Sequence, residues 1–357
     1  MTKQLPAGSV IGILGGGQLG RMLSVAASRL GYRTHIFEPS AGAPAAQVAD
    51  QLTTAPYEDK DALTAFANSV DVITYEFENI PTAALDVLEK LRPIHPDRRA
   101  LAVSQDRLAE KQYLQSIGLS VAPYAEVNSV DDLQAAMAEI GVPSILKTRR
   151  FGYDGKGQVR LNTDSDPETA FTELAGAPAV LEGFIEFERE ISVIGTRAAD
   201  GQVACFDPGE NVHLDGILHT TTVPAQISGR QRMDAVLLAS QILTSLQYVG
   251  VMGVELFVTK SGLIINEIAP RVHNSGHWTQ QGCTIDQFEQ HIRAIAGWSL
   301  GDGQRFADIE MLNLIGDDVD KLTDLAATPH TSIHMYGKAA VRAGRKMGHV
   351  NRVTSVR

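Results

Sequence analysis

The hydrophobic and polar positions of the first hundred residues follow the pattern of a parallel α/β domain. Short apolar runs at 9–14, 34–38 and 71–75 predict buried strands. Between the first two runs, apolar residues recur every three or four positions from Leu19 to Leu30, which predicts an amphipathic helix. This order of strand, helix and strand is typical of a Rossmann-like βαβ unit.

Beyond residue 100, the periodicity predicts helices mixed with short strands. The expected helices span 104–117, 130–140, 166–174, 229–246 and 283–296. The expected strands span 145–147, 158–161, 179–185, 188–196, 202–207, 253–258, 263–268, 311–315, 332–336 and 346–350. Ser104 is expected to cap the first of these helices. The segment 208–223 has little periodicity, so no element is predicted there.

A glycine-rich loop follows the strand that ends at Lys147. It contains Gly152, Gly155 and Gly157 around a second lysine, Lys156. Glycines let backbone N–H groups approach an anion closely, and lysines supply the charge. The stretch therefore favours a site that grips and covers a polyphosphate, although an exposed cationic hairpin would have the same composition.

A second glycine-rich loop joins the first strand to the first helix. Gly15, Gly17 and Gly20 match a dinucleotide-binding pattern, and Glu38 ends the next strand. Such a loop binds phosphate through its N–H groups, but it does not say whose phosphate. Glu76 and Glu78 follow the third strand at the same edge of the sheet. They are either ligand-binding residues or part of a solvated loop.

Two acids are expected to meet in the hairpin formed by 253–258 and 263–268. If the turn centres near Ser261, Glu255 lies directly opposite Glu267 on one face. Like charges opposite each other destabilise a sheet, and a divalent cation between them removes the conflict. We therefore predict a Mg²⁺ site that Asn266 could complete from the strand end. Protonation of one acid or a shifted register would be the alternative.

Composition and charge restrict the class of protein. The 357 residues suffice for two or three domains, and the net charge of -11 argues against a general nucleic-acid binder. Cys205 and Cys283 make neither a disulfide framework nor a zinc cluster. The apolar N-terminal run is too short for a signal peptide, and no later run is long enough to span a membrane. We expect a cytoplasmic protein.

Taken together, the motifs resemble those of the ATP-grasp ligases and, within them, the N5-carboxyaminoimidazole ribonucleotide synthetases of purine biosynthesis. The resemblance runs nearly end to end. It rests on GGGQLGRM (15–22), YEFEN (75–79), RFGYDGKGQ (150–158), NEIAPRVHNSGHWT (266–279), HMYGK (334–338) and RKMGH (345–349).

The resemblance implies an ATP-grasp fold of mixed α/β and α+β class. A Rossmann-like substrate domain at 1–100 would precede a linker helix and lid at 101–185. The ATP-grasp core with its Mg²⁺ site would span 186–300, and a small β-rich part would span 301–357. A homodimer is expected from the family.

The family pattern also implies the role of each site residue. ATP would contact Arg107, Lys147, Gly152, Tyr153, Asp154, Gly155, Lys156, Gly157, Gln158, Glu182, Gly183, Phe184, Ile185, Glu190, His213, Asn266 and Glu267. Mg²⁺ would be held by Glu255, Glu267 and Asn266. Aminoimidazole ribonucleotide would contact Gln18, Leu19, Glu76, Tyr153, Asp154, Lys338 and Arg345. Bicarbonate would lie near Arg271, His273 and Asn274, which with Lys147 form the implied catalytic set.

The implied reaction uses ATP and bicarbonate to carboxylate aminoimidazole ribonucleotide through carboxyphosphate. Three alternatives stay open at this point. The N-terminal glycine loop with Glu38 also fits an NAD-dependent dehydrogenase. A sibling ATP-grasp ligase, such as the formate-dependent glycinamide ribonucleotide transformylase, would share the phosphate loop and the acid pair. A non-catalytic nucleotide-binding regulator is the third alternative, although it would not need an intact acid pair.

Overall fold

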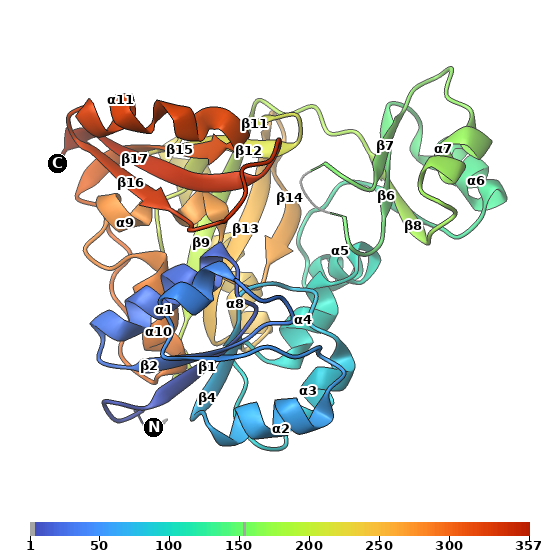
Figure 1. Cartoon of the computed structure of the whole chain (residues 1–357). Coiled ribbons are helices and arrows are strands. Elements are labelled where there is room, and N and C mark those ends of the chain that lie inside the picture. The colour runs from blue at the N-terminus through green and yellow to red at the C-terminus, as the bar shows by residue number, and fades with distance from the viewer. Residues whose placement is uncertain (1–3, 153–154) are drawn as a thin grey trace.

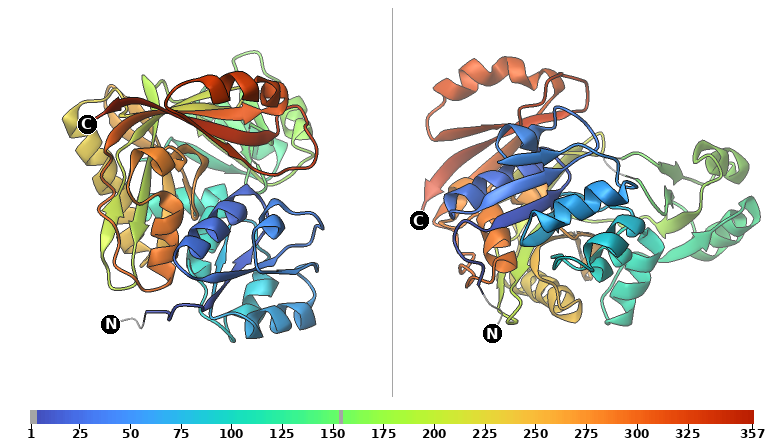
Figure 2. Two further views of the ribbon diagram at one scale, coloured as in Figure 1. Left: turned by 60° about the vertical axis from the view of Figure 1, so that its left-hand side comes forward. Right: turned by 60° about the horizontal axis from the view of Figure 1, so that its bottom comes forward.

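A computed structural model describes residues 4–152 and 155–357 of the chain. In the described residues it contains three sheets: one in the N-terminal region, one in a projecting segment, and one that runs through the core and the C-terminal strands (Figure 1). The segment from β5 (Tyr124–Val127) to β8 (Ala179–Gly183), with helices α6 (Val130–Ile140) and α7 (Pro167–Glu173), projects away from the rest of the molecule in Figure 1. The N-terminal sheet and the C-terminal strands lie one above the other on the opposite side (Figure 2).

The N-terminal sheet is parallel, as the apolar runs predict. Its strand order is β3-β2-β1-β4. The strands are β1 (Val10–Leu14), β2 (Arg33–Phe37), β3 (Gln51–Thr53) and β4 (Val72–Tyr75). Helix α1 (Gln18–Arg29) follows β1 and packs against helix α10 of the core, so the two regions share one hydrophobic cluster. The carboxyl ends of β1 and β4 lie at the edge of the sheet where ligands of such sheets collect.

The projecting segment has its own antiparallel sheet of order β5-β8-β6-β7. These strands are β5 (Tyr124–Val127), β6 (Ser144–Thr148), β7 (Gln158–Leu161) and β8 (Ala179–Gly183). Lys147 pairs with Gln158, which confirms the predicted antiparallel pair around the second glycine loop. A separate hydrophobic cluster supports this sheet.

The third sheet joins the core to the C-terminal strands. Its order is β14-β13-β9-β11-β12-β15-β17-β16, with β10 paired to β9. The strands are β9 (Arg189–Arg197), β10 (Val203–Cys205), β11 (Gly209–Leu214), β12 (Ile217–Val223), β13 (Gly250–Thr259), β14 (Gly262–Ala269), β15 (Ala307–Ile315), β16 (Thr331–Met335) and β17 (Lys346–Val356). Because β12 pairs with β15, the C-terminal strands extend the core sheet. The predicted division into four segments stays a prediction.

The remaining elements cover these sheets. They are α2 (Lys60–Asn68), α3 (Thr82–Leu88), α4 (Arg98–Ser104), α5 (Arg107–Ser116), α6 (Val130–Ile140), α7 (Pro167–Glu173), α8 (Gly229–Ser245), α9 (Thr279–Gly282), α10 (Gln287–Ile295), α11 (Leu322–Ala327) and the 3₁₀ turns η1 (Pro44–Gln47), η2 (Asn274–Gly276) and η3 (Gly316–Lys321). No helix in the described parts of the chain is long and apolar enough to cross a membrane.

Two sequence predictions were wrong in detail. Ser104 does not cap a helix, because it ends α4; Asp106 caps α5 by accepting hydrogen bonds from the N–H groups of Leu108 and Ala109. The segment 208–223 does form a hairpin, β11–β12. A register shift between Val212 and His213 breaks its alternation, which explains why periodicity did not reveal it.

Candidate active site

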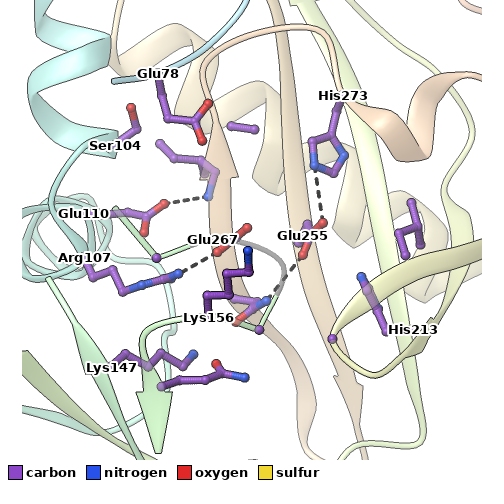
Figure 3. A pocket seen from close by; sticks show the side chains of 18 of the residues that line it. Glu78, Ser104, Arg107, Glu110, Lys147, Lys156, His213, Glu255, Glu267 and His273 are labelled. Atoms are coloured by element: carbon purple, nitrogen blue, oxygen red, sulfur yellow. Dashed lines mark hydrogen bonds and ion pairs between the residues drawn. The ribbon is translucent and has the colours of Figure 1, made fainter. Parts of the chain in front are cut away.

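A cavity of about 720 Å³ lies where the three sheets meet, and Figure 3 shows part of its lining. Most of the predicted site residues line it. They are Gln18, Leu19, Glu76, Arg107, Lys147, Gly152, Gly155, Lys156, Gln158, Glu182, Gly183, Phe184, Ile185, Glu190, His213, Glu255, Asn266, Glu267, Arg271, His273 and Asn274. Tyr153 and Asp154 lie outside the described residues. Segments far apart in sequence thus converge on one space, while the individual roles of these residues stay predictions.

The N–H groups of the N-terminal glycine loop already bind carboxylates of the protein. Glu76 accepts hydrogen bonds from Gly17 at 2.5 Å and from Gly20 at 2.8 Å, and Glu38 accepts one from Gly16 at 2.8 Å. A Cβ at Gly17 would lie 2.5 Å from an oxygen of Glu76, so the close approach of that carboxylate requires glycine there. The loop therefore does not favour a dinucleotide, because Glu76 takes the place of the pyrophosphate at the helix N-terminus.

The acid pair forms as predicted, although by a different route. Glu255 pairs directly with Glu267 in the β13–β14 hairpin, which confirms the expected register. The turn has two residues between Thr259 and Gly262, so it is not centred on Ser261 as predicted. A regular ladder continued from this turn would place Asn266 opposite Glu255. An irregularity after Glu255 skips Asn266 and restores the acid pair. Asn266 Nδ2 then lies 3.4 Å from Glu255 Oε2.

The environment of the acid pair suits a hard divalent cation. Burial and, next, the charge of Glu267 raise the pKa of Glu255 to about 7. No group of three His, Cys, Asp or Glu side chains that could hold a metal occurs in the described residues, so the protein offers two carboxylates and an amide. That donor set fits Mg²⁺, which binds one or two carboxylates and takes its other ligands from phosphates and water.

Helix α5 contributes Arg107 and Glu110 to the cavity lining and Lys111 to the buried contacts behind it, and the sequence indicated a site role only for Arg107. Arg107 Nη1 lies 3.1 Å from Glu267 Oε2, beside the acid pair. Glu110 accepts a hydrogen bond of 2.6 Å from the N–H of Ile268, next to Glu267. Lys111, almost fully buried, lies 3.1 Å from Glu182. Their partners are more than 70 residues away, so no local pattern could have revealed Glu110 and Lys111.

Glu182 on β8 and Lys147 on β6 form a buried ion pair where the projecting sheet meets the cavity. Lys147 Nζ lies 3.0 Å from Glu182 Oε2, the same oxygen that Lys111 approaches. Burial raises the pKa of Glu182, but the two lysines outweigh it and leave that pKa below its usual value. Glu182 Oε1 is buried and has no hydrogen-bond partner among the described residues. It is an acceptor beside the cavity that a ligand N–H group could use.

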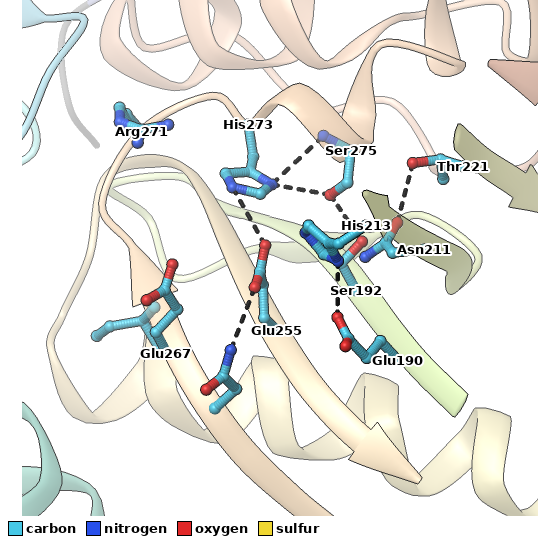
Figure 4. Close-up of polar contacts among 12 residues, drawn as sticks. Glu190, Ser192, Asn211, His213, Thr221, Glu255, Glu267, Arg271, His273 and Ser275 are labelled. Atoms are coloured by element: carbon cyan, nitrogen blue, oxygen red, sulfur yellow. Dashed lines mark hydrogen bonds and ion pairs between the residues drawn. The ribbon is translucent and has the colours of Figure 1, made fainter. Parts of the chain in front are cut away.

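On the opposite wall, the β11–β12 hairpin brings His213 next to Glu190. His213 Nδ1 lies 2.7 Å from Glu190 Oε2 (Figure 4). Burial lowers the pKa of His213, but the carboxylates of Glu190 and Glu255 outweigh it, so the pKa is raised. Both residues line the cavity.

The turn after β14 carries the predicted anion site. Burial and, next, the charge of Arg271 lower the pKa of His273 to about 3, so the ring is neutral at pH 7. The N–H of Ser275 donates to His273 Nδ1, which leaves the ring proton on Nε2, 3.5 Å from Glu255 Oε1. Asn274 has both amide atoms buried without a partner among the described residues. The turn therefore presents a cation, a neutral N–H donor and an unpaired amide.

Of the basic residues Lys338, Arg345 and Lys346 near the C-terminus, only Lys346 is among the described residues that line the cavity. Lys346 lines the cavity, although no role was predicted for it from the sequence. Lys338 and Arg345, which were predicted to bind substrate, bind backbone carbonyls of Lys346 and Ala340 at 2.7 and 2.9 Å. Neither of them, nor Gly157, is among the described residues that line the cavity. A substrate role for these three residues stays a prediction.

Family models match three consecutive parts of the chain. A ribonucleotide synthetase preATP-grasp domain matches residues 9–105, and an ATP-grasp domain matches residues 112–288. A phosphoribosylaminoimidazole carboxylase C-terminal domain matches residues 310–356. The fold is therefore the ATP-grasp fold preceded by a preATP-grasp domain, which confirms the fold that the motifs implied.

Relatives and solved structures agree with these matches. An N5-carboxyaminoimidazole ribonucleotide synthase of Brucella melitensis is 53% identical over 352 residues, covering 98% of this chain and 97% of that protein. A Staphylococcus aureus N5-carboxyaminoimidazole synthetase complexed with ADP has a TM-score of 0.94 at 38% identity, covering 99% and 95% of the two chains. An Aspergillus clavatus synthase in complex with ADP and 5-aminoimidazole ribonucleotide has a TM-score of 0.92 at 30% identity, covering 98% and 94%. On this likeness, the chain belongs to the N5-carboxyaminoimidazole ribonucleotide synthases, which are ATP-grasp ligases.

Proposed function

We propose that this chain carboxylates the exocyclic amine of aminoimidazole ribonucleotide, with ATP and bicarbonate as the other substrates. One observation carries the proposal. A single cavity joins a cationic loop, an acid pair and an anion-binding turn to the loop that follows β4. The Aspergillus relative, whose crystal structure contains ADP and aminoimidazole ribonucleotide, has the same fold. These comparisons favour neither the sibling ATP-grasp ligase nor the NAD-dependent dehydrogenase.

ATP would lie between the lid and the core. The phosphates would contact Lys147, Arg107 and the N–H groups of the loop 152–158, since cations and glycine amides both suit polyphosphate. The adenine would lie along Glu182–Ile185, where the unpaired Oε1 of Glu182 can accept a hydrogen bond from an amino group. The ribose would face Glu190 and His213.

The cation would lie at the acid pair, between Glu255 and Glu267, with Asn266 beside it. When bound, Mg²⁺ would neutralise charge on the phosphate oxygens and help to align the γ-phosphate. The fit rests on the direct pairing of two carboxylates and on the raised pKa of Glu255. Arg107 would remain at Glu267 and would join the phosphate contacts.

Bicarbonate would bind at the turn after β14. Arg271 supplies positive charge, neutral His273 supplies an N–H donor, and Asn274 supplies an amide whose donor and acceptor are unpaired. A bicarbonate oxygen held there would face the γ-phosphate of ATP. Positioning and charge neutralisation of this kind supply most of the catalysis in phosphoryl transfer.

The chemistry would proceed in two steps. In the first, a bicarbonate oxygen attacks the γ-phosphorus, the bond to the β-phosphate oxygen breaks, and ADP leaves with that electron pair. In the second, the exocyclic amine attacks the carbonyl carbon of carboxyphosphate, or CO₂ released from it, and inorganic phosphate leaves. Because an acyl phosphate hydrolyses readily, exclusion of water by the loop 152–158 would favour product.

Aminoimidazole ribonucleotide would lie on the N-terminal side of the cavity. Gln18, Leu19 and Glu76 form that wall, and Lys346 reaches the cavity from β17. A phosphate there would be attracted by Lys346 and by Lys338 and Arg345 behind it. The N-terminal glycine loop would then contribute to this nucleotide through Gln18 and Leu19, because the N–H groups of Gly16, Gly17 and Gly20 already bind glutamates.

The release of ADP tests the proposal when each substrate is omitted in turn. We expect rapid release only with MgATP, bicarbonate and aminoimidazole ribonucleotide together. ADP release that does not depend on aminoimidazole ribonucleotide but responds to another amine or to formate would overturn the substrate assignment.

The homodimer, the absence of nucleic-acid binding and the cytoplasmic location stay predictions. Sedimentation equilibrium would test the homodimer.

A further inference from the structure

Glu78 occupies an unusual position between two regions of the molecule. It lies in the loop after β4 of the N-terminal sheet, two residues beyond Glu76. Its carboxylate meets Arg271, which belongs to the turn after β14 of the core. Arg271 Nε lies 2.5 Å from Glu78 Oε2, and Arg271 Nη2 lies 3.3 Å from Glu78 Oε1. The contact therefore joins residues that are 193 positions apart in the chain.

The geometry is that of a two-point clamp on the guanidinium. Two parallel N–H···O contacts fix both the position and the plane of an arginine, which a single contact does not. Arg271 Nη1 also donates to the carbonyl of Val272 at 3.2 Å. These bonds use three of the five N–H groups of Arg271 and leave two for an anion in the cavity.

The loop that carries Glu78 is itself held from both sides. Gln105 Nε2 donates to the backbone carbonyls of Glu78 and Ile80 at 2.7 and 2.9 Å. Glu76 binds the glycine loop through Gly17 and Gly20. Burial raises the pKa of Glu78, but Arg271 outweighs it and leaves that pKa lowered, so the carboxylate stays charged at neutral pH. The clamp is thus ionised, and hydrogen bonds from two other segments hold the loop that carries it.

We propose that Glu78 is a positioning residue for the reaction, which fixes the plane of Arg271 so that its remaining N–H groups face bicarbonate. The inference rests on the proposed function of this cavity. Glu78 does not need to touch any substrate; it acts through Arg271. Because the same loop carries Glu76 on the nucleotide side, the orientation of the bicarbonate site depends on the loop that lines the aminoimidazole ribonucleotide site.

The test is the variant Glu78→Gln, which keeps the size of the side chain but removes its charge and one acceptor oxygen. Without the clamp, we expect the KM for bicarbonate to rise about tenfold and kcat to fall, while the KM values for MgATP and aminoimidazole ribonucleotide stay within about twofold. Glu78→Asp keeps the charge but shortens the reach, so it should give a smaller rise in the same constant. Both variants should melt within about 2 °C of the wild type.

The matched control is Glu89→Gln. Glu89 also pairs with an arginine of the N-terminal region, Arg98 at 2.6 Å, but on the surface. The Glu89→Gln substitution should leave the KM values for bicarbonate, MgATP and aminoimidazole ribonucleotide unchanged. An unchanged bicarbonate KM in Glu78→Gln, or an equal rise of all three KM values, would overturn the positioning role. If the wild type releases ADP without needing bicarbonate, the proposed function fails instead, so the two failures are distinguishable.

Discussion

The two glycine-rich loops of this chain look alike in sequence and differ in what surrounds them. At Gly15–Gly20, carboxylates of the protein accept the hydrogen bonds of three loop N–H groups. Arg107 and Lys147 line the same cavity as Gly152 and Gly155, and no carboxylate among the described residues accepts a hydrogen bond from Gly152, Gly155 or Gly157. The first loop is held by carboxylates of the protein, whereas we propose that the second binds the phosphates of ATP. A glycine pattern therefore indicates a phosphate site only when nothing in the protein occupies its donors.

The acids that accompany the loops differ in the same way. Glu76 is surrounded by donors of the protein itself. Glu255 and Glu267 face each other with too few donors to balance them, which favours a cation from solution. Four predictions test this contrast, from the largest expected effect to the smallest.

Glu267→Gln removes one charge from the acid pair but keeps the shape of the side chain. We expect the rate of ADP release to fall at least about 1,000-fold, because phosphoryl transfer depends on neutralised and aligned phosphates. The fold should persist, since the substitution relieves a repulsion. Steady-state kinetics and a melting curve measure both effects. A near-normal rate would contradict a metal role for the pair.

Glu76→Ala leaves the N–H groups of Gly17 and Gly20 without their acceptor. We expect a loss of about 2 to 6 kcal/mol in the free energy of unfolding, because each of the two buried unpaired donors costs about 1 to 3 kcal/mol. Urea denaturation measures it, with Glu89→Ala as a surface control. An unchanged stability would mean that the first loop is not held by its carboxylate.

The stability of the metal-free protein should depend on pH through Glu255. Its pKa is about 7 in the folded chain and lies near its ordinary value, about 4.3, when unfolded, so the folded state binds the extra proton. This stabilisation is complete below the unfolded pKa and is lost as pH rises towards 7. Between pH 5.5 and 7.5, the wild type should lose roughly 1 to 2 kcal/mol more than Glu255→Gln. Equal pH dependence of the two proteins by urea denaturation would refute the raised pKa.

Gly157→Ala tests the second loop at a position that only glycine adopts easily. Gly157 has φ +70°, and a Cβ there would lie 2.7 Å from Thr148 Oγ1. We expect the KM for MgATP to rise about fivefold, which corresponds to about 1 kcal/mol of strain. The melting temperature should change little because the loop is at the surface. A large loss of stability with an unchanged KM for MgATP would mean that this loop, like the N-terminal glycine loop, mainly holds the fold together.

The sequence predicted the parts of this site that depend on local pattern. Alternation and turn residues correctly placed Glu255 opposite Glu267. The prediction missed both the two-residue turn and the irregularity at Asn266, and the effects of these two features on the register cancel. The pairing of Lys147 with Gln158 needed only the two flanking apolar runs. Motif resemblance supplied the family and most of the residues that line the cavity.

The contacts that cross between regions could not be predicted. Arg271 meets Glu78 over 193 positions, and Arg107 meets Glu267 over 160. Such partners are fixed by how the three sheets pack, which no short window of sequence encodes. For the same reason, the sequence did not reveal that Glu76 accepts the hydrogen bonds of the N–H groups of Gly17 and Gly20 in the first glycine loop.

The central claim, that bicarbonate attacks ATP in this cavity, can be tested with ¹⁸O-labelled bicarbonate. One bicarbonate oxygen becomes bonded to the γ-phosphorus in the first step and stays with phosphate when carboxyphosphate breaks down. Mass spectrometry of the inorganic phosphate should therefore find one ¹⁸O in each phosphate formed with aminoimidazole ribonucleotide present. Phosphate that carries no ¹⁸O while product forms would contradict the account.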